Sequence, residues 1–278
     1  REDGRGRGLM KYCIAVGQTT SPTTPLLLEG DFVESMRRAH AMGYDAVEIH
    51  TPDPDTLDVT RLRAACDELG MFIATLGTGM IYGKYGLYLM DEDETRQARI
   101  VDMVKHYIDI ASSIGSKVTI GSIKGNVPKG ADREKCLAIM GKCMQEISAH
   151  AVQQGVQVLL EATNHFENNV LNTGKDVHDF IERYGLKNVQ ALIDSFHVNI
   201  EERDVTAGLR DAGSYLGHIH FGDNIRWYPG SGAFDFDAFC QGIRDVGYDG
   251  VLSVEVFPLP DGETAAQKSI EFFRKHFG

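Results

Sequence analysis

The fold is decided by a stretch near the start of the chain, DFVESMRRAHAMGYDAVEIH, which covers residues 31–50. Its first part, 31–42, is predicted to be a helix because its apolar residues recur at helical spacing on one face. Gly43 follows, and a helix often ends at a glycine because glycine adopts the left-handed conformation without a Cβ clash. The apolar run 46–50 then predicts a strand, so the stretch reads as helix, glycine, strand.

The same junction recurs six more times along the chain. Helix-like segments run up to glycines 70, 115, 155, 185, 213 and 247, and predicted strands follow at 71–76, 117–120, 156–161, 189–194, 215–221 and 251–256. An opening strand at 12–17 and a final helix at 264–277 complete eight strands and eight helices. This strict alternation predicts parallel strands joined by right-handed crossovers.

Eight such units predict an α/β protein with a (β/α)8 TIM barrel in a single domain, residues 10–278. A doubly wound open sheet is the alternative, but the first turn, 17–20, lacks the glycine-rich dinucleotide fingerprint. Residues 1–9 are mostly polar and rich in glycine and arginine. We interpret them as a disordered tail or a cloning remnant, with Met10 as the natural start.

Composition excludes several classes of protein. The chain has 278 residues, of which 42% are apolar, and this suits a globular protein with a sizeable core. A formal charge of −12 argues against a nucleic-acid surface, and no apolar run is long enough for a membrane helix. The five cysteines are odd in number and scattered, with no Cys-x-x-Cys pair. This pattern is typical of reduced thiols, and we therefore expect a cytoplasmic protein.

Two long segments follow predicted strands and belong to the functional face of such a barrel. The first, 77–91, carries Met80, Tyr82, Tyr85 and Tyr88, and the second is 121–130. The tyrosine and methionine run is interpreted as a substrate contact, with a dimer contact or a packed lid as alternatives. A homo-oligomer is therefore left open.

The late strands end in side chains that can carry chemistry. Glu161, Asp194 and Glu255 each follow a run of buried aliphatic residues, and His220 lies near the end of another strand. His218 precedes it by two residues and so faces the same way. One such residue alone would be a strand-end cap or a salt-bridge partner, but four in successive strands favour one shared site.

Carboxylates that meet at the same end of the barrel would repel each other, and their loss of hydration would cost much free energy. A divalent cation removes that conflict. Three carboxylates and one imidazole favour Mn2+, Mg2+ or Co2+ over a structural zinc ion.

A set of motifs carries a resemblance to a known family. The motifs are Glu161-x-x-Asn164-x-x-Glu167, Asp194-x-x-His197, His218-x-His220-x-x-Asp223-x-x-Arg226 with Pro229-Gly230, and Ser253-Val254-Glu255. With them the chain resembles the xylose-isomerase-like sugar epimerases and isomerases, and within these the ketose 3-epimerases of the D-tagatose 3-epimerase type. The resemblance covers everything from Met10 onward.

Further stretches are similar to the 5-keto-L-gluconate epimerase branch of these enzymes. They are Gly77-Thr78-Gly79, residues 196–202, Arg226-Trp227 and Leu259-Pro260. Two positions depart from the pattern: Ala162 stands where many relatives have proline, and His165 where arginine is frequent. Both departures bear on the substrate and leave the expected metal site intact.

The resemblance implies a role for each matching residue. Glu161, Asp194, His220 and Glu255 would hold one divalent metal ion, with Mn2+ favoured. Glu161 and Glu255 would also be the acid and base that take a proton from the sugar and return it through a metal-bound enediolate. The residues expected to contact the substrate, chiefly at its carbonyl end, are Glu167, His197, His218, Arg226 and Trp227. Trp227 could form an apolar wall against the face of the sugar or pack at the rim of the barrel, and the sequence leaves both roles open.

The preferred function is therefore a metal-dependent epimerase of a ketose or keto sugar acid. A 3-keto-glycoside lyase or an aldose–ketose isomerase would use the same metal site. A DNA-repair endonuclease of this fold needs more histidines on early strands, where only His50 is found, and a sugar-binding barrel leaves the paired glutamates unexplained. A free sugar is preferred to a sugar phosphate as the substrate, because the loops after the last two strands lack the glycine-rich sequence that binds phosphate groups. A lysine that reached the site, Lys84, Lys124 or Lys129, would reverse this preference.

Overall fold

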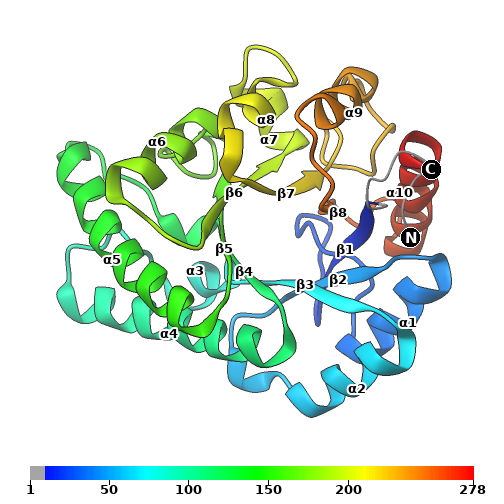
Figure 1. The fold of residues 1–278 in the computed structure, drawn as a ribbon, viewed down its shortest axis with the longest axis horizontal. Helices are drawn as coiled ribbons and strands as arrows, with labels where there is room; N and C mark the ends of the chain where they lie inside the picture. The colour runs from blue at the N-terminus through cyan, green and yellow to red at the C-terminus, as the bar shows by residue number, and fades with distance from the viewer. Residues whose placement is uncertain (1–9) are drawn as a thin grey trace.

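The computed structural model describes residues 10–278 and shows a closed barrel of eight parallel strands in chain order (Figure 1). The strands are β1 (Lys11–Gly17), β2 (Ala46–His50), β3 (Phe72–Gly77), β4 (Lys117–Ile120), β5 (Val158–Ala162), β6 (Val189–Asp194), β7 (Leu216–Phe221) and β8 (Val251–Val254). Pairing of β1 with both β2 and β8 closes the barrel. The predicted single-domain TIM barrel is confirmed.

Most helices lie on the outside of the barrel (Figure 1). The helices are α1 (Phe32–Met42), α2 (Val59–Leu69), α3 (Met80–Tyr85), α4 (Glu94–Ile114), α5 (Arg133–Gln154), α6 (Gly174–Tyr184), α7 (Ser195–Glu201), α8 (Ala207–Ala212), α9 (Phe236–Asp245) and α10 (Gly262–Phe277). The short helix α3 lies inside the ring formed by α4 and α5 (Figure 1). Short 3-10 turns lie at Pro54–Thr56, Ser122–Lys124 and Gly213–Tyr215. Within residues 10–278, no helix combines the length and apolarity needed to span a membrane.

The first helix–glycine–strand junction has the predicted geometry. Gly43 has a φ of 99° and donates its N–H to Ala39 O at 3.1 Å and His40 O at 2.9 Å. These two hydrogen bonds end the last turn of α1, and the chain then continues into β2. At the sixth junction the structure differs, because α8 has only six residues and a 3-10 turn that starts at Gly213 leads into β7.

Strand boundaries agree with the sequence at 46–50, 117–120 and 189–194 and differ by one or two residues elsewhere. The predicted strand 156–161 starts only at Val158, because Val156 N still bonds to Ala151 O at the end of α5. The final helix begins at Gly262, before the predicted 264, because Asp261 caps it by accepting a hydrogen bond from Thr264 N. The helices α3 and α7, in the segments after β3 and β6, were not predicted.

The side chains inside the barrel change from apolar to polar along the barrel axis. Small apolar side chains, Cys13, Ala46 and Ala74, pack together at the end where the strands begin. Val47 and Ile49 point outward into the core beneath the helices. Since side chains alternate along a strand, Glu48 and His50 share the inward face with Ala46. The interior therefore becomes polar toward the carboxyl ends of the strands, where barrel enzymes hold their sites.

Candidate active site and metal centre

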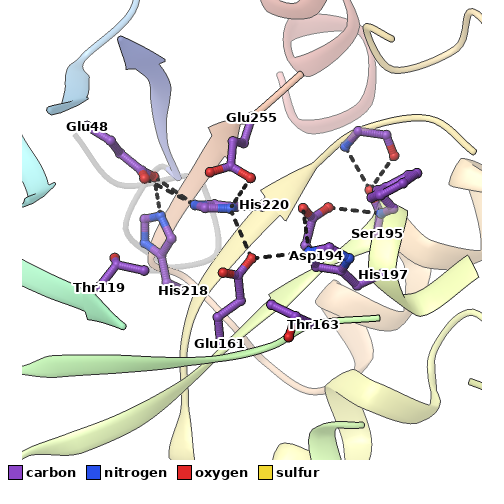
Figure 2. A network of polar contacts seen from close by, with 12 residues as sticks. Glu48, Thr119, Glu161, Thr163, Asp194, Ser195, His197, His218, His220 and Glu255 are labelled. Carbon is purple, nitrogen blue, oxygen red and sulfur yellow. Dashed lines mark hydrogen bonds and ion pairs between the residues drawn. The ribbon is translucent and has the colours of Figure 1, made fainter. Parts of the chain in front are cut away.

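Four strands bring the predicted metal ligands to one place. Glu161 lies near the end of β5, Asp194 ends β6, His220 lies near the end of β7, and Glu255 directly follows β8. The register pairs Asp194 with His220 on the neighbouring strands. All four side chains are buried and point toward one another (Figure 2). Each offers one ligand atom, and these four atoms lie within 4.8 Å of one another.

The Nδ1 atom of His220 faces two of the carboxylates. It lies 4.0 Å from Glu161 Oε1 and 3.7 Å from Glu255 Oε2. Asp194 uses Oδ1 to accept a hydrogen bond from Phe196 N at 2.9 Å, which caps α7, and leaves its Oδ2 for the cluster. The short helix α7 thus fixes the direction of the Asp194 carboxylate.

The cluster contains buried polar atoms with no hydrogen-bond partner. They are Glu161 Oε1, Asp194 Oδ2 and His220 Nδ1. Such groups are costly to bury unless something compensates them. A cation compensates all of them at once, and a donor set of three carboxylates and one imidazole suits Mn2+, Mg2+ or Co2+. The residues present therefore fit the divalent ion that the sequence predicts.

The two glutamates of the cluster have pKa values shifted in opposite directions. Burial raises the pKa of the Glu161 carboxyl, and the nearby charge of Glu255 adds to this effect. Burial also opposes ionisation of Glu255, but the charges of His220 and Arg226 outweigh it and hold the pKa of Glu255 below its usual range. A pair of carboxyl groups with pKa values driven apart is typical of acid–base sites.

A cavity of about 380 Å3 opens above the cluster. Of the predicted site residues, Glu161, Glu255, Glu167 and Arg226 line it, whereas Asp194, His220 and His197 are not among its lining residues. Hydroxyl-bearing residues and one histidine form much of the remaining wall, together with apolar side chains. These are Thr23, Thr24, Thr78, Thr119, Ser122, His50, Leu26, Met80 and Phe257.

Arg226 links the two sides of the cavity. Its guanidinium donates to Glu167 Oε1 at 2.8 Å and to Glu255 Oε2 at 2.9 Å. The turn that presents it is organised by Asp223, whose carboxylate accepts N–H groups from Asn224, Gly230 and Phe234. Arg226 itself has a φ of 58°, a left-handed conformation that non-glycine residues rarely adopt. Such backbone outliers cluster at functional sites.

His197 lies beside the cluster with one ring nitrogen free. Its Nδ1 is 2.7 Å from the amide nitrogen of Asn164, and that amide also donates to Glu167 Oε1. Since the amide donates, His197 Nδ1 accepts and Nε2 carries the proton. This Nε2 is buried without a partner, 3.5 Å from Glu161 Oε1. Burial lowers the pKa of His197, so the ring stays neutral and presents an N–H to the site.

Two predicted contacts are placed elsewhere. His218 does not line the cavity, because its Nε2 bonds to Glu48 Oε1 deep inside the barrel. Trp227 is half-buried and also lies outside the cavity lining. As substrate contacts, His218 and Trp227 stay predictions.

The lysines considered for a phosphate do not line the cavity either. Lys124 is fully buried and donates to Glu161 O and to Thr163 Oγ1, and burial lowers its pKa to about 8. Lys84 lies 3.9 Å from Asp53, and Lys129 is exposed on the surface. In the segment 77–91, Met80 reaches the cavity, whereas Tyr82 is exposed and stacks edge-on with Tyr88.

Two residues at the site were given no role by the sequence analysis. Glu48 is fully buried and contacts both His218 and His220, and His50 lines the cavity with an unpaired Nε2. Both are in the stretch that decides the fold. The available signal was a carboxylate within an otherwise apolar strand, two residues before a histidine.

Comparison with known families gives an independent result. The profile of the family described as xylose isomerase-like TIM barrel matches residues 36–276. A ketose 3-epimerase of Arthrobacter globiformis is 28% identical over 80% of this chain and 76% of its own. A 3-dehydro-D-guloside 4-epimerase of Escherichia coli is 27% identical over 81% of this chain and 87% of its own.

Solved structures give the same fold. A D-allulose 3-epimerase from Methylomonas sp., in complex with D-allulose, superposes with a TM-score of 0.82 and 23% identity. The match covers 97% of this chain and 98% of that enzyme. The two chains therefore share the barrel fold over the matched length.

Proposed function

Since the chain belongs to the xylose isomerase-like TIM barrel family, we propose that it is a carbohydrate epimerase, and hence an isomerase, that depends on a divalent metal ion. Its similarity to ketose and keto-sugar epimerases supports this class of reaction. The proposed substrate is a free ketose or keto sugar acid. A position within the 5-keto-L-gluconate epimerase branch, a cytoplasmic location and a homo-oligomeric state stay predictions.

One observation carries the proposal. Glu161 and Glu255 come from strands that are not neighbours, and both line the cavity. The Nδ1 of His220 lies between them, 4.0 Å from one carboxylate and 3.7 Å from the other. An epimerase must take a proton from one face of a planar intermediate and return one to the other face. Two carboxylates that flank one centre meet this requirement.

The proposed metal ligands are Glu161, Asp194, His220 and Glu255. An ion held by these residues would act as a Lewis acid that polarises the carbonyl of the sugar and the hydroxyl beside it. Mn2+ is the favoured ion, with Mg2+ and Co2+ as alternatives.

The protein's own residues then account for proton transfer. One of the two glutamates removes the proton next to the carbonyl, and the other delivers a proton to the opposite face of the enediolate. Arg226 and the Nε2–H of His197 donate hydrogen bonds to the oxygen on which negative charge develops. Reversing the roles of Glu161 and Glu255 gives the reverse reaction, so the base depends on which epimer is bound.

The test is turnover of a panel of ketoses and keto sugar acids in D2O with added Mn2+. Because each carboxylate can exchange its proton with solvent, the product should carry deuterium at the carbon that inverts, as seen by NMR. Product without deuterium at any carbon, even at low conversion, contradicts the proposal. The identity of the product also separates an epimerase from a lyase or an aldose–ketose isomerase.

Matched variants assign the two proton carriers. Glu161→Gln and Glu255→Gln should each abolish epimerisation, and one of them should still exchange the proton of one epimer. Glu167→Gln removes a carboxylate from the same cavity and is the control, which should weaken substrate binding but keep deuterium incorporation. If Glu167→Gln alone abolished incorporation while the other variants stayed active, the assignment would be reversed.

A further inference from the structure

A carboxylate buried inside the barrel has no role in the proton transfer described above. Glu48 lies in the middle of β2, points into the barrel and has no exposed surface. Figure 2 shows it opposite His218 and His220, on the side of His220 away from Glu161 and Glu255. Below it on the same strand face lies Ala46, in the small apolar layer.

The contacts of Glu48 define which ring nitrogens carry protons. Both carboxylate oxygens lie 3.1 Å from Nε2 of His220, and Oε1 lies 2.6 Å from Nε2 of His218. An ionised carboxylate only accepts hydrogen bonds, so both Nε2 atoms must donate. A histidine that ligates a metal ion is neutral, and in that state of His220 a proton on Nε2 leaves Nδ1 without one. That atom is the one that faces Glu161 and Glu255 without a partner.

We propose that Glu48 is a positioning residue that fixes the orientation and the tautomer of His220, so that Nδ1 is presented as a metal ligand. This inference rests on the proposed metal site. A hydrogen-bonded carboxylate behind a histidine also makes the ligand nitrogen more basic. His218 contributes by donating to the same carboxylate, which holds Glu48 in place.

The cost of burying Glu48 favours this role over simple space filling. Removing a carboxylate from water costs several kcal/mol, and good hydrogen bonds repay only part of it. The neighbouring interior positions, Cys13 and Ala46, are filled by small apolar side chains at no such cost. A buried charge at this point is therefore explained by what it does to its two histidine partners.

A second metal ion held by Glu48, His218 and His220 is the competing reading of the same cluster. Two ligand atoms about 2.0–2.1 Å from a tetrahedral ion lie roughly 3.3 Å apart. The 2.6 Å between His218 Nε2 and Glu48 Oε1 is a hydrogen-bond length instead. The stoichiometry of metal binding separates these readings.

The experiment measures binding of Mn2+ alone by calorimetry to wild type and Glu48→Gln. Wild type should bind one ion per chain, and the variant should bind it about 10–100-fold more weakly. The amide of glutamine can turn its NH2 toward His220 Nε2 and so favour the wrong tautomer. Glu202→Gln is the matched control, because Glu202 is a half-buried carboxylate that accepts a hydrogen bond from Gly174 N outside the barrel. Its affinity should equal that of wild type.

A spectroscopic readout separates positioning from a merely structural effect. In the wild-type protein with Mg2+, ring 15N shifts of His220 should show the proton on Nε2, and Glu48→Gln should lose this signature. If Glu48→Gln fails to fold by circular dichroism, Glu48→Asp carries the test, because it keeps the charge but withdraws it from both rings. Weaker Mn2+ binding is then expected in a folded protein.

Each other outcome overturns a defined statement. Equal Mn2+ affinity in wild type and Glu48→Gln overturns the inference alone. A proton on Nδ1 of His220 in the wild-type Mg2+ form overturns the inference and also removes His220 from the proposed ligand set, because a protonated Nδ1 cannot bind a metal ion. Two ions per wild-type chain also overturn it, in favour of a second metal site. A wild-type chain that binds no Mn2+ overturns the proposed metal site and, with it, the role of Glu48.

Discussion

Arg226 shows how much of the site depends on one residue. It holds a left-handed backbone conformation, which costs an L-residue about 1–2 kcal/mol. Hydrogen bonds in the turn oppose this cost, since Arg226 N donates to Asp223 O and Phe257 N donates to Arg226 O, both at 2.8 Å. The guanidinium also lies 4.7 Å from the ring centre of Phe196. The side chain is therefore held in place before any substrate arrives.

Replacing Arg226 should damage catalysis and spare metal binding. Arg226→Ala should lower kcat on the order of 10²–10³-fold, because a donor to the developing negative charge is lost. Arg226→Lys keeps the positive charge but lacks the planar guanidinium that donates two hydrogen bonds side by side, so its kcat should lie between those of Arg226→Ala and wild type. Steady-state kinetics and elemental analysis of the metal check this. Unchanged kinetics in Arg226→Ala would remove the residue from the site, and loss of metal would show that it supports the ligands instead.

At the scale of elements, the ends of β2 and β3 approach each other closely at the cavity. His50 is paired in register with Gly77. A Cβ atom on Gly77 would lie 2.3 Å from Nδ1 of His50 and 2.5 Å from its Cε1. Real contacts are never this short, so Gly77 leaves the room that the His50 ring occupies in the cavity wall.

Gly77→Ala should therefore push the His50 ring aside. Overpacking of this kind typically costs 1–3 kcal/mol, and the change in the cavity wall should also raise KM. Gly83→Ala in α3 is the control, because a Cβ there meets no atom within 4 Å and should be neutral or stabilise by up to about 1 kcal/mol. Urea unfolding and kinetics measure both. Equal stability and KM in the two variants would show that the cavity wall adapts freely.

For the molecule as a whole, the site exists only when the barrel is closed. Its four predicted ligands come from β5 to β8, and β8 is held in place by pairing with β1 at the other end of the chain. An unfolded chain cannot bring these side chains together. A bound ion should therefore stabilise the folded protein by mass action.

Removing the metal should lower the melting temperature. An ion present at 100 times its Kd adds about 2.7 kcal/mol to the free energy of unfolding. For a chain of this size, that corresponds to roughly 5 °C. Calorimetry with Mn2+ and with a chelator measures the difference. Asp194→Asn should melt at the same temperature in both conditions, and a full shift in that variant would contradict the proposed ligand set.

The sequence by itself determined the order of the eight strands, the helix that precedes each of β2 to β8, and the end of the barrel at which the site lies. These follow from local signals, such as the helical stripe before Gly43 and the carboxylate at the end of the strand 189–194. Parallel strands place their carboxyl ends together, so Glu161, Asp194, His220 and Glu255 could be grouped without coordinates. The helical and strand patterns behind these predictions each extend over only a few residues, so they can be read from the sequence alone.

Only the tertiary structure decided what lies opposite each of these residues. The two-residue alternation of a strand shows that His218 and His220 share a face. It does not show that His218 lies deeper in the barrel than His220, against a glutamate 170 positions away in the sequence. Lys124 similarly turns inward to Glu161 O and Thr163 and so misses the cavity. The depth of a side chain in a barrel depends on the tilt and stagger of all eight strands, and these are set by contacts between distant segments.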